Sequence, residues 1–226
     1  MHEFEQSAFL LHSRPYREHQ QLVELLTENE GKVSAVAYVS HSQKSNKKGL
    51  LQPFLPLRIV LKGKSNLRNL SRVESSGKAF TLTGNHLYSA FYLNELLVKL
   101  LGEHVVCARL FHQYQESLTA LANNHSIERV LREFELYLLD ELGQAFDFTA
   151  VFEIESPTVY YVLEEGFIPA INKMPLPCFD ITHIQAIARQ ELACEYVQQS
   201  YKILMRQVFS QLLGGKPLNS RKLFTK

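Results

Sequence analysis

Residues 57–73 read LRIVLKGKSNLRNLSRV, and this stretch decides how the first third of the chain is interpreted. Its first six residues alternate between apolar and polar positions, which predicts a strand with one buried face and places Arg58 and Lys62 together on the other. The glycine and asparagine that follow favour a turn. The last seven residues resume a period of two, which predicts a second strand with Arg68 and Arg72 on one face.

Three further strands are expected before this stretch, at residues 8–13, 20–27 and 32–39. The first is predicted to end at Arg14-Pro15, and the turn before the third contains asparagine and glycine, which accept a positive φ. Five short strands with a long basic loop at residues 40–49 indicate a small β-barrel of the OB-fold type. An SH3-like barrel or a small open sheet would give the same pattern.

The basic residues are concentrated in the first third of the chain. Residues 31–73 contain nine lysines and arginines and no acidic residue, although the net charge of the whole chain is only +1. Residues 1–80 hold 12 basic and 7 acidic residues, a net charge of +5, which leaves 12 basic and 16 acidic residues for the rest. A basic N-terminal module favours nucleic-acid binding. A basic face that only maintains solubility is the alternative.

The hydrophobic period becomes helical after residue 84. Helices are expected at 87–101, 105–122, 127–142 and 194–213, the third capped by Ser126. Strand-like segments at 149–154 and 158–163 predict a small hairpin near 149–171, and Thr182 with Gln185 predicts a capping box for a further helix. The expected fold is therefore α+β, with a five-stranded OB-fold barrel in a domain at 1–80 and a mainly helical domain with a β-hairpin insert at 81–226.

No complete catalytic or metal motif is present in the sequence, so the chain is not expected to be an enzyme. The nine histidines are scattered. Cys107, Cys178 and Cys194 cannot pair evenly and form no C-x-x-C, so they are expected to be buried thiols and not disulfides or zinc ligands. The acidic start and the lack of an apolar run of about 18 residues favour a cytoplasmic protein without a membrane segment.

Five strings, in order along the chain, resemble the RecO family of bacterial recombination and repair proteins. They are AFLLHSRPYRE at 8–18, LQPF at 51–54, Leu87-Tyr88-Ser89 with YLNELL at 92–97, REFE at 132–135 leading to Leu142-Gly143, and GGKPLNSR at 214–221. Each string alone is weakly specific. Their order on an independently inferred barrel and helical plan makes the resemblance strong.

The resemblance implies a non-catalytic recombination mediator. Such a protein binds single- and double-stranded DNA, anneals strands coated with single-stranded-DNA-binding protein, and acts with RecR to load RecA. No cofactor is implied, and a cytoplasmic, nucleoid-associated location is expected. Many relatives carry a four-cysteine zinc motif in the second domain, but that region has only Cys178 here, with Cys194 beyond it, so zinc is expected to be absent.

The DNA-binding residues are expected among the loop cations and one sheet face of the barrel. Tyr16, Tyr38 or Phe54 could add base stacking if exposed, although apolar neighbours favour the core for each of them. The predicted DNA-binding set is Arg14, Arg17, Lys44, Lys47, Lys48, Arg58, Lys62, Lys64 and Arg68.

The resemblance also implies a docking site on the helical domain for the acidic, phenylalanine-ended tail of single-stranded-DNA-binding protein. Such a tail needs a cation for its carboxylates and an apolar hollow for its terminal ring. The helix predicted at 127–142 offers both kinds of residue, and the predicted set is Arg129, Leu131, Arg132 and Phe134.

Three other functions remain open from the sequence. An OB-fold RNA-binding or ribosome-associated factor would explain the charge but not the ordered strings. A protein adaptor would use the helical domain, with the basic face binding an acidic protein. An enzyme of unrecognised type would need polar residues that converge in one pocket, which the sequence does not show.

Overall fold

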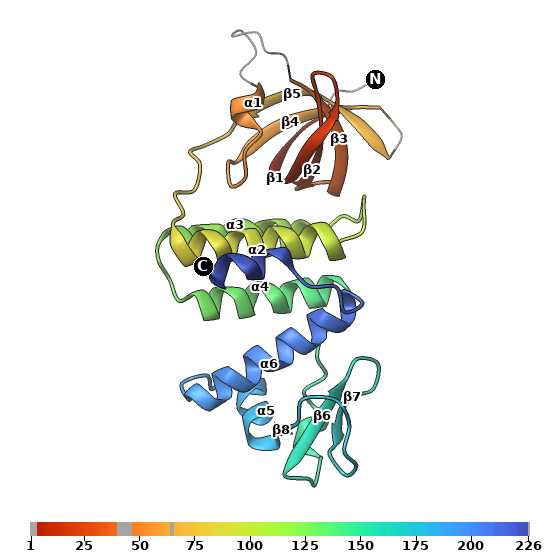
Figure 1. Ribbon diagram of the computed structural model, residues 1–226, viewed down its shortest axis with the longest axis vertical. Helices are drawn as coiled ribbons and strands as arrows, with labels where there is room; N and C mark the ends of the chain where they lie inside the picture. The colour runs from red at the N-terminus through yellow and green to blue at the C-terminus, as the bar shows by residue number, and fades with distance from the viewer. Residues whose placement is uncertain (1–3, 40–46, 64–65, 226) are drawn as a thin grey trace. The chain divides into compact units, whose positions relative to one another are not determined.

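The computed structural model describes residues 4–39, 47–63 and 66–225, which belong to two compact units (Figure 1). The first unit combines Met1–Glu141 with Leu218–Lys226, and the second is Leu142–Pro217. The chain therefore leaves the first unit once and returns to it. The domain boundary predicted near residue 80 falls inside the first unit, between the barrel and its helices, and stays a prediction.

Five strands of the first unit close into a barrel with the order β1-β2-β3-β5-β4. They are β1 (Glu5–Arg17), β2 (Gln20–Thr27), β3 (Gly31–Tyr38), β4 (Leu57–Lys62) and β5 (Leu67–Ser75), and the short helix α1 (Lys47–Leu50) lies between β3 and β4 in the chain. The β3–β5 pair is parallel and the other pairs are antiparallel. This topology confirms the predicted OB-fold barrel.

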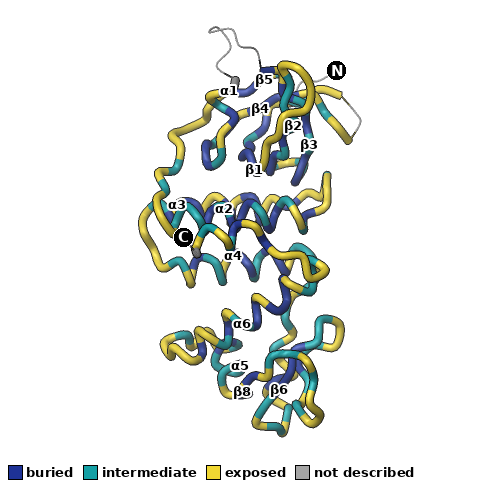
Figure 2. Tube along the Cα trace, viewed as in Figure 1, coloured by how far each residue is buried: buried dark blue, intermediate teal, exposed yellow. Residues whose placement is uncertain are grey.

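The barrel is filled by the apolar residues that alternate along its strands. Val23, Leu25, Ala35, Leu57 and Ile59 have no exposed surface and belong to one hydrophobic cluster. Figure 2 shows buried segments along these strands, and buried positions alternate with half-buried or exposed ones along β2, β3 and β4. Burying each large aliphatic side chain stabilises the fold by about 1.5–3 kcal/mol, so the period-two pattern determines which face of each strand turns inward.

A bulge in β5 overturns one sequence prediction. Val60 lies opposite Arg72 and Leu61 lies opposite Leu70, so Ser71 is an extra residue, and its hydroxyl donates to the Val60 carbonyl at 3.0 Å. An extra residue reverses the alternation of side chains beyond it. Arg68 therefore lies on the side of Leu70, and the prediction that it shares a face with Arg72 is wrong.

The first strand is longer than predicted, since β1 continues through Pro15 to Arg17. Beyond Ala8 it pairs with β2 alone, because its pairing with β4 covers only Glu5 to Ala8. Proline is tolerated in a strand where its missing N–H would face no partner. Pro15 therefore does not end the strand.

Three helices complete the body of the first unit: α2 (Gly84–Leu100), α3 (Ala108–Ala122) and α4 (Ile127–Glu141). The outer side of β1 packs on them through Phe9, whose ring centroid is 5.6 Å from that of Phe111 and 5.2 Å from that of Tyr114. As predicted, Ser126 caps α4, accepting from the Arg129 N–H at 3.4 Å. The barrel and the helices thus share an apolar interface.

Gly31 allows the loop between α2 and α3 to lie against the barrel. Its φ is +67°, and a Cβ placed on it would be 1.8 Å from the carbonyl oxygen of Val105. The next residue, Lys32, donates from Nζ to the Val98 carbonyl at 2.8 Å, and its own carbonyl accepts from the His104 N–H at 2.9 Å. Only glycine fits both the conformation and the space at residue 31.

The C-terminal 3₁₀ helix η2 (Asn219–Thr225) is held on α2 by Glu95. One oxygen of Glu95 accepts from the Asn219 N–H at 2.8 Å and pairs with Lys99 at 2.9 Å, and the other accepts from the Ser220 N–H and hydroxyl at 2.8 and 2.7 Å. Burial alone would raise the pKa of Glu95, but these contacts lower it to about 2. The carboxylate therefore fastens η2 while it is ionised.

The second unit contains a small sheet with the order β7-β6-β8. Its elements are η1 (Ala150–Phe152), β6 (Thr158–Val162), β7 (Gly166–Pro169), β8 (Phe179–Asp180), α5 (Ile181–Ala188) and α6 (Glu195–Leu212). The antiparallel pair β6–β7 confirms a hairpin, but the strand predicted at 149–154 is wrong, because this segment contains the helical turn η1.

The cap of α5 also differs from the prediction. Asp180 is the N-cap residue, and its carboxylate accepts from the Thr182 N–H at 2.8 Å. The side chain of Gln185 instead donates to the Val151 carbonyl at 3.0 Å. Thr182 and Gln185 therefore do not form the expected capping box, since Asp180 occupies the cap position two residues earlier.

Candidate nucleic-acid interface

The outer face of the barrel carries a continuous row of residues that crosses all five strands. Residues opposite one another on neighbouring strands have side chains on the same face. Since Val23 and Ala35 point into the core, their chain neighbours Leu22 and Val36 point outward. The strand registers connect the outward row Arg14, Leu22, Val36, Asn69 and Lys62, with a cation at each end.

A second outward row lies beside the first, at the end of the sheet near the β1–β2 turn. Arg17 is opposite Gln20, and Gln20 is opposite Tyr38. At the other end of the sheet, the row of Phe9, Leu26 and Lys32 is buried. The exposed part of the outer face therefore begins with His12 and extends to the β1–β2 turn.

The structure places the predicted DNA-binding residues at different parts of the barrel. Arg14 and Arg17 lie at the exposed end of β1, and Arg58 and Lys62 are exposed on β4. The backbone of Lys47 and Lys48 forms the start of α1, so the loop predicted at 40–49 is wrong for its last residues. Lys44 and Lys64 lie outside the described residues. The registers thus bring Arg14 and Lys62 into one row.

Three nearby carboxylates offset part of the basic charge. Arg58 lies 4.0 Å from Glu5, Arg68 lies 2.8 Å from Glu30, and Arg72 lies 2.8 Å from Glu74. All three acids come from outside the acid-free segment of the sequence. Exposed pairs such as Arg72 with Glu74 are worth at most about 1 kcal/mol, so a phosphate can compete for these arginines.

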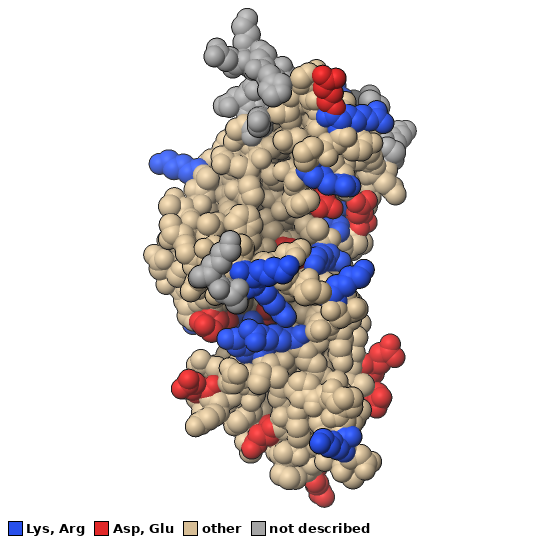
Figure 3. All heavy atoms as spheres, viewed as in Figure 1, with Lys and Arg blue, Asp and Glu red and all other residues tan. Residues whose placement is uncertain are grey.

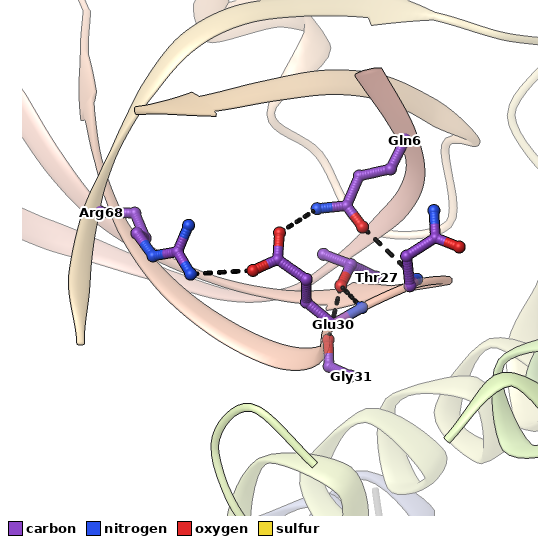
Figure 4. A network of polar contacts seen from close by, with 6 residues as sticks. Gln6, Thr27, Glu30, Gly31 and Arg68 are labelled. Carbon is purple, nitrogen blue, oxygen red and sulfur yellow. Dashed lines mark hydrogen bonds and ion pairs between the residues drawn. The ribbon is translucent and has the colours of Figure 1, made fainter. Parts of the chain in front are cut away.

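Arg68 differs from the other cations because its ion pair belongs to a network at one end of the barrel (Figure 4). Its side chain is 20% exposed, and it donates to Glu30, whose other oxygen accepts from Gln6 Nε2 at 2.7 Å. The Thr27 hydroxyl donates to the Gly31 carbonyl at 2.9 Å and accepts from the Glu30 N–H at 3.2 Å. Arg68 therefore stabilises the β2–β3 turn.

Two of the three aromatic residues considered for base stacking are exposed. Tyr16 is 43% exposed and Tyr38 is 56% exposed, against the expectation that both would lie in the core. Phe54 does lie in the core, at 5% exposure, with its ring centroid 5.0 Å from that of Phe91. The alternation in β3 could have revealed Tyr38, because Val33, Ala35 and Ala37 occupy the inward positions.

The predicted tail-binding residues lie on α4 but not on one surface. Arg129 is exposed and Leu131 is half-buried, whereas Phe134 has no exposed surface and lies 6.4 Å from Tyr114 between ring centroids. The Arg132 side chain is 16% exposed and donates at 2.9 Å to Glu135, which is fully buried. Arg129 and Leu131 are therefore the members of this set with the greater exposure.

Glu135 also accepts from the Tyr92 hydroxyl, at 2.6 Å. Burial, followed by the charge of Glu135, raises the pKa of Tyr92, and the charges of Arg132 and Arg221 oppose that shift. In Figure 3, Lys and Arg side chains gather over the region of α2, α4 and η2. Of the basic residues of η2, Lys222 is exposed.

In the parts of the chain that the structure describes, no group of three or more histidine, cysteine, aspartate or glutamate side chains could hold a metal ion. No helix among those residues is both long enough and apolar enough to cross a membrane. Cys107 is buried, as predicted, which raises the pKa of its thiol to about 11. Cys178 and Cys194 are free thiols but are exposed, so the prediction that they are buried is wrong.

Comparison with known proteins agrees with the barrel and helical plan. The model "Recombination protein O N terminal" matches residues 1–78, and "Recombination protein O C terminal" matches residues 82–159. The proteins named DNA repair protein RecO from Tolumonas auensis and Cellvibrio japonicus are 42% and 41% identical to this chain. The first alignment covers 96% of this chain and 93% of the relative, and the second covers 97% and 96%. This chain belongs to the RecO family of DNA repair and recombination proteins.

Proposed function

We propose that this protein is a non-catalytic recombination mediator whose barrel binds single- and double-stranded DNA. It anneals complementary strands coated with single-stranded-DNA-binding protein and acts with RecR to load RecA. The observation that carries the proposal is the outward row from Arg14 to Lys62, which crosses the whole OB-fold sheet and has a basic residue at each end. This row winds around the outside of the closed barrel, and a sugar-phosphate backbone that runs across the strands can follow it.

The chemistry of this face favours binding without sequence preference. Arginine and lysine contact phosphates, which are the same in every nucleotide, and DNA of both forms carries them. Each neutralised phosphate releases counterions, so the logarithm of the affinity for a single strand falls by roughly 0.7 per contact for each tenfold rise in salt. The ion pairs at Arg58 and Arg72 are exposed enough to exchange their carboxylates for phosphates.

The same proposal assigns the partner's acidic tail to the surface of α4 around Arg129 and Leu131. Arg129 is exposed on this helix, and its guanidinium can bind a carboxylate through two parallel hydrogen bonds. Arg132 contributes positive charge from a less exposed position. In this arrangement the barrel and the tail site use different surfaces of the first unit, so one chain can hold the strand and its coating protein together.

Strand annealing tests the central claim. Complementary oligonucleotides precoated with single-stranded-DNA-binding protein are mixed with the protein, and duplex formation is followed by fluorescence transfer. The double variant Arg14→Glu and Lys62→Glu is expected to anneal at least tenfold more slowly and to bind with a shallower salt dependence. A matched control makes the same charge change at two exposed residues of α6, Lys202→Glu and Arg206→Glu.

Two results would count against the proposal. If the parent protein binds oligonucleotides with an affinity that does not change with salt, the barrel face is not a phosphate-binding surface. If RNA competes for the protein at least as well as single-stranded DNA and no annealing occurs, an RNA-binding role explains the same face better.

A further inference from the structure

The end of the barrel at the β1–β2 turn carries exposed rings that its packing does not require. Tyr38 is 56% exposed and Tyr16 is 43% exposed, and the β1–β2 turn adds the exposed ring of His19. The phosphate contacts proposed above use cations, so they leave these rings unexplained. Exposed aromatic faces of this kind are the usual platforms for nucleic-acid bases.

The backbone fixes the positions of these residues. Tyr38 and Arg17 lie on the same outward face because both are in register with Gln20. His19, with a φ of +57°, accepts from the Val39 N–H through its carbonyl at 2.7 Å, which fastens the β1–β2 turn to the end of β3. The rings are therefore presented by paired strands and a short turn.

The planar side chains at this turn form two pairs, His19 with Tyr38 and Arg17 with Tyr16. The His19 ring lies 6.3 Å from the Tyr38 ring between centroids, and the Arg17 guanidinium carbon lies 5.2 Å from the centroid of Tyr16. The turn also carries Glu18, whose side chain is 91% exposed and whose carboxylate lies 3.7 Å from His19 Nε2. This acid opposes the charge of Arg17, so the turn attracts phosphate less than the row from Arg14 to Lys62 does.

We propose that Tyr16, Arg17, His19 and Tyr38 form a stacking platform for the unpaired bases of a single DNA strand. The platform deepens the proposed function and rests on it, because the adjacent cationic row must hold the backbone of the same strand. A duplex hides the faces of its bases in its own stack, so only a single strand can use both surfaces. The row from Arg14 to Lys62 therefore binds either form of DNA. The stacking platform adds affinity for single-stranded DNA alone, so the protein prefers the single strand.

The chain itself offers a spectroscopic test, because it contains no tryptophan. In Tyr38→Trp, the new indole is the only one in the protein, and a stacked base quenches its fluorescence. This variant is expected to keep its affinity for a single-stranded oligonucleotide and to lose emission when the strand binds. An oligonucleotide of the same length without bases is expected to bind more weakly and to leave the emission unchanged.

The affinities of one variant for single-stranded and for duplex DNA distinguish base stacking from charge attraction. Tyr38→Leu keeps an apolar side chain but removes the ring, and it is expected to weaken single-strand binding about tenfold, which corresponds to 1.4 kcal/mol for one base, while duplex binding stays within twofold. The control Tyr196→Leu removes a ring that is 75% exposed on α6 and is expected to change neither affinity.

The outcomes distinguish this inference from the function on which it rests. A parent protein that binds no DNA in a salt-dependent way removes both. A parent that binds DNA normally, combined with an unchanged single-strand affinity in Tyr38→Leu or an unquenched Tyr38→Trp, removes the platform alone. Equal losses for the single strand and the duplex in Tyr38→Leu also overturn it, since a duplex has no free base faces to stack.

Discussion

Arg68 and Glu30 are joined by a hydrogen bond of 2.8 Å that connects β5 to the β2–β3 turn. The same carboxylate accepts from Gln6 on β1, so a single acid links three parts of the barrel. The sequence assigned Arg68 to DNA binding by its charge. The contact shows that this arginine has a structural role, which separates it from Arg14 on the exposed outer face.

Replacing Arg68 with methionine should change the stability of the protein, whereas replacing Arg14 with methionine should change its affinity for DNA. Arg68→Met is expected to lower the free energy of unfolding by about 1–2 kcal/mol, because Glu30 loses a charged donor at a partly buried position. Arg14→Met should leave stability within about 0.5 kcal/mol and weaken DNA binding severalfold. Urea unfolding and fluorescence anisotropy measure the two quantities. A stable Arg68→Met protein with strongly weakened DNA binding would return Arg68 to the DNA-binding set.

Gly31→Ala is expected to destabilise the first unit by about 2–5 kcal/mol. The methyl group must adopt a positive φ, which costs about 1–2 kcal/mol, and it meets the backbone carbonyl of Val105, which cannot move aside as a flexible side chain would. Gly84→Ala is the control, since Gly84 has a φ of +51° with no atom within 4 Å of the added carbon. If thermal unfolding shows a similar loss of stability for both variants, the close approach to Val105 does not contribute to the destabilisation of Gly31→Ala.

The contact between Glu95 and η2 predicts a pH-dependent part of stability. The pKa of Glu95 falls from its ordinary value of 4.5 to about 2, so its contribution is complete above about pH 4.5 and disappears as the pH falls through 2. Glu95→Gln should lower stability by about 1–2 kcal/mol at pH 7, and the difference from the parent should shrink steadily between pH 4.5 and pH 2. Glu133→Gln, at an exposed position on α4, serves as the control. A difference that is constant with pH would exclude the charge of Glu95 as the cause.

Alanine variants of Arg129 and Arg132 should have different effects on the binding of the acidic tail and on the stability of the fold. Arg132→Ala is expected to cost about 3 kcal/mol of unfolding free energy, since it removes a charged partner of the buried Glu135. Arg129→Ala should unfold like the parent and bind the acidic tail peptide roughly tenfold more weakly. Thermal unfolding and peptide titration on the same samples make the comparison. If Arg129→Ala binds the peptide normally, the docking surface lies elsewhere on the protein.

The elements predicted best from the sequence are those in which apolar residues recur regularly because one face is buried. The predicted strands at 20–27 and 57–62 match β2 and β4, because their alternation reflects the closed barrel core. The segment at 149–154 failed because a local contact prevails over its strand-like composition. Asp147 accepts from the Thr149 N–H at 2.9 Å, and Thr149 adopts a helical conformation before η1.

The candidate site was predicted less well because a linear sequence does not show which residues lie across a sheet. The segment without acids seemed to present a purely basic surface, but Glu5 and Glu30 reach its arginines from a neighbouring strand and a turn. Glu74 reaches Arg72 from two residues further along β5. The bulge at Ser71 did leave a signal in the pattern, because Leu70 and Val73 are both buried in the barrel core three residues apart, an odd spacing that a strict period of two does not allow. The row from Arg14 to Lys62 needed the registers of all five strands.

The return of the chain to α2 has a consequence for the order of synthesis. Leu218 is buried and Phe224 packs on Tyr88 at 5.7 Å between ring centroids, so the first unit needs residues that a ribosome adds after the whole second unit. A nascent chain that stops anywhere in residues 142–217 leaves Glu95 without its partners from η2. The barrel can close early in translation, but its helical support is completed only when residues 218–225 emerge, so a prematurely terminated product would expose the surface of α2 to proteolysis.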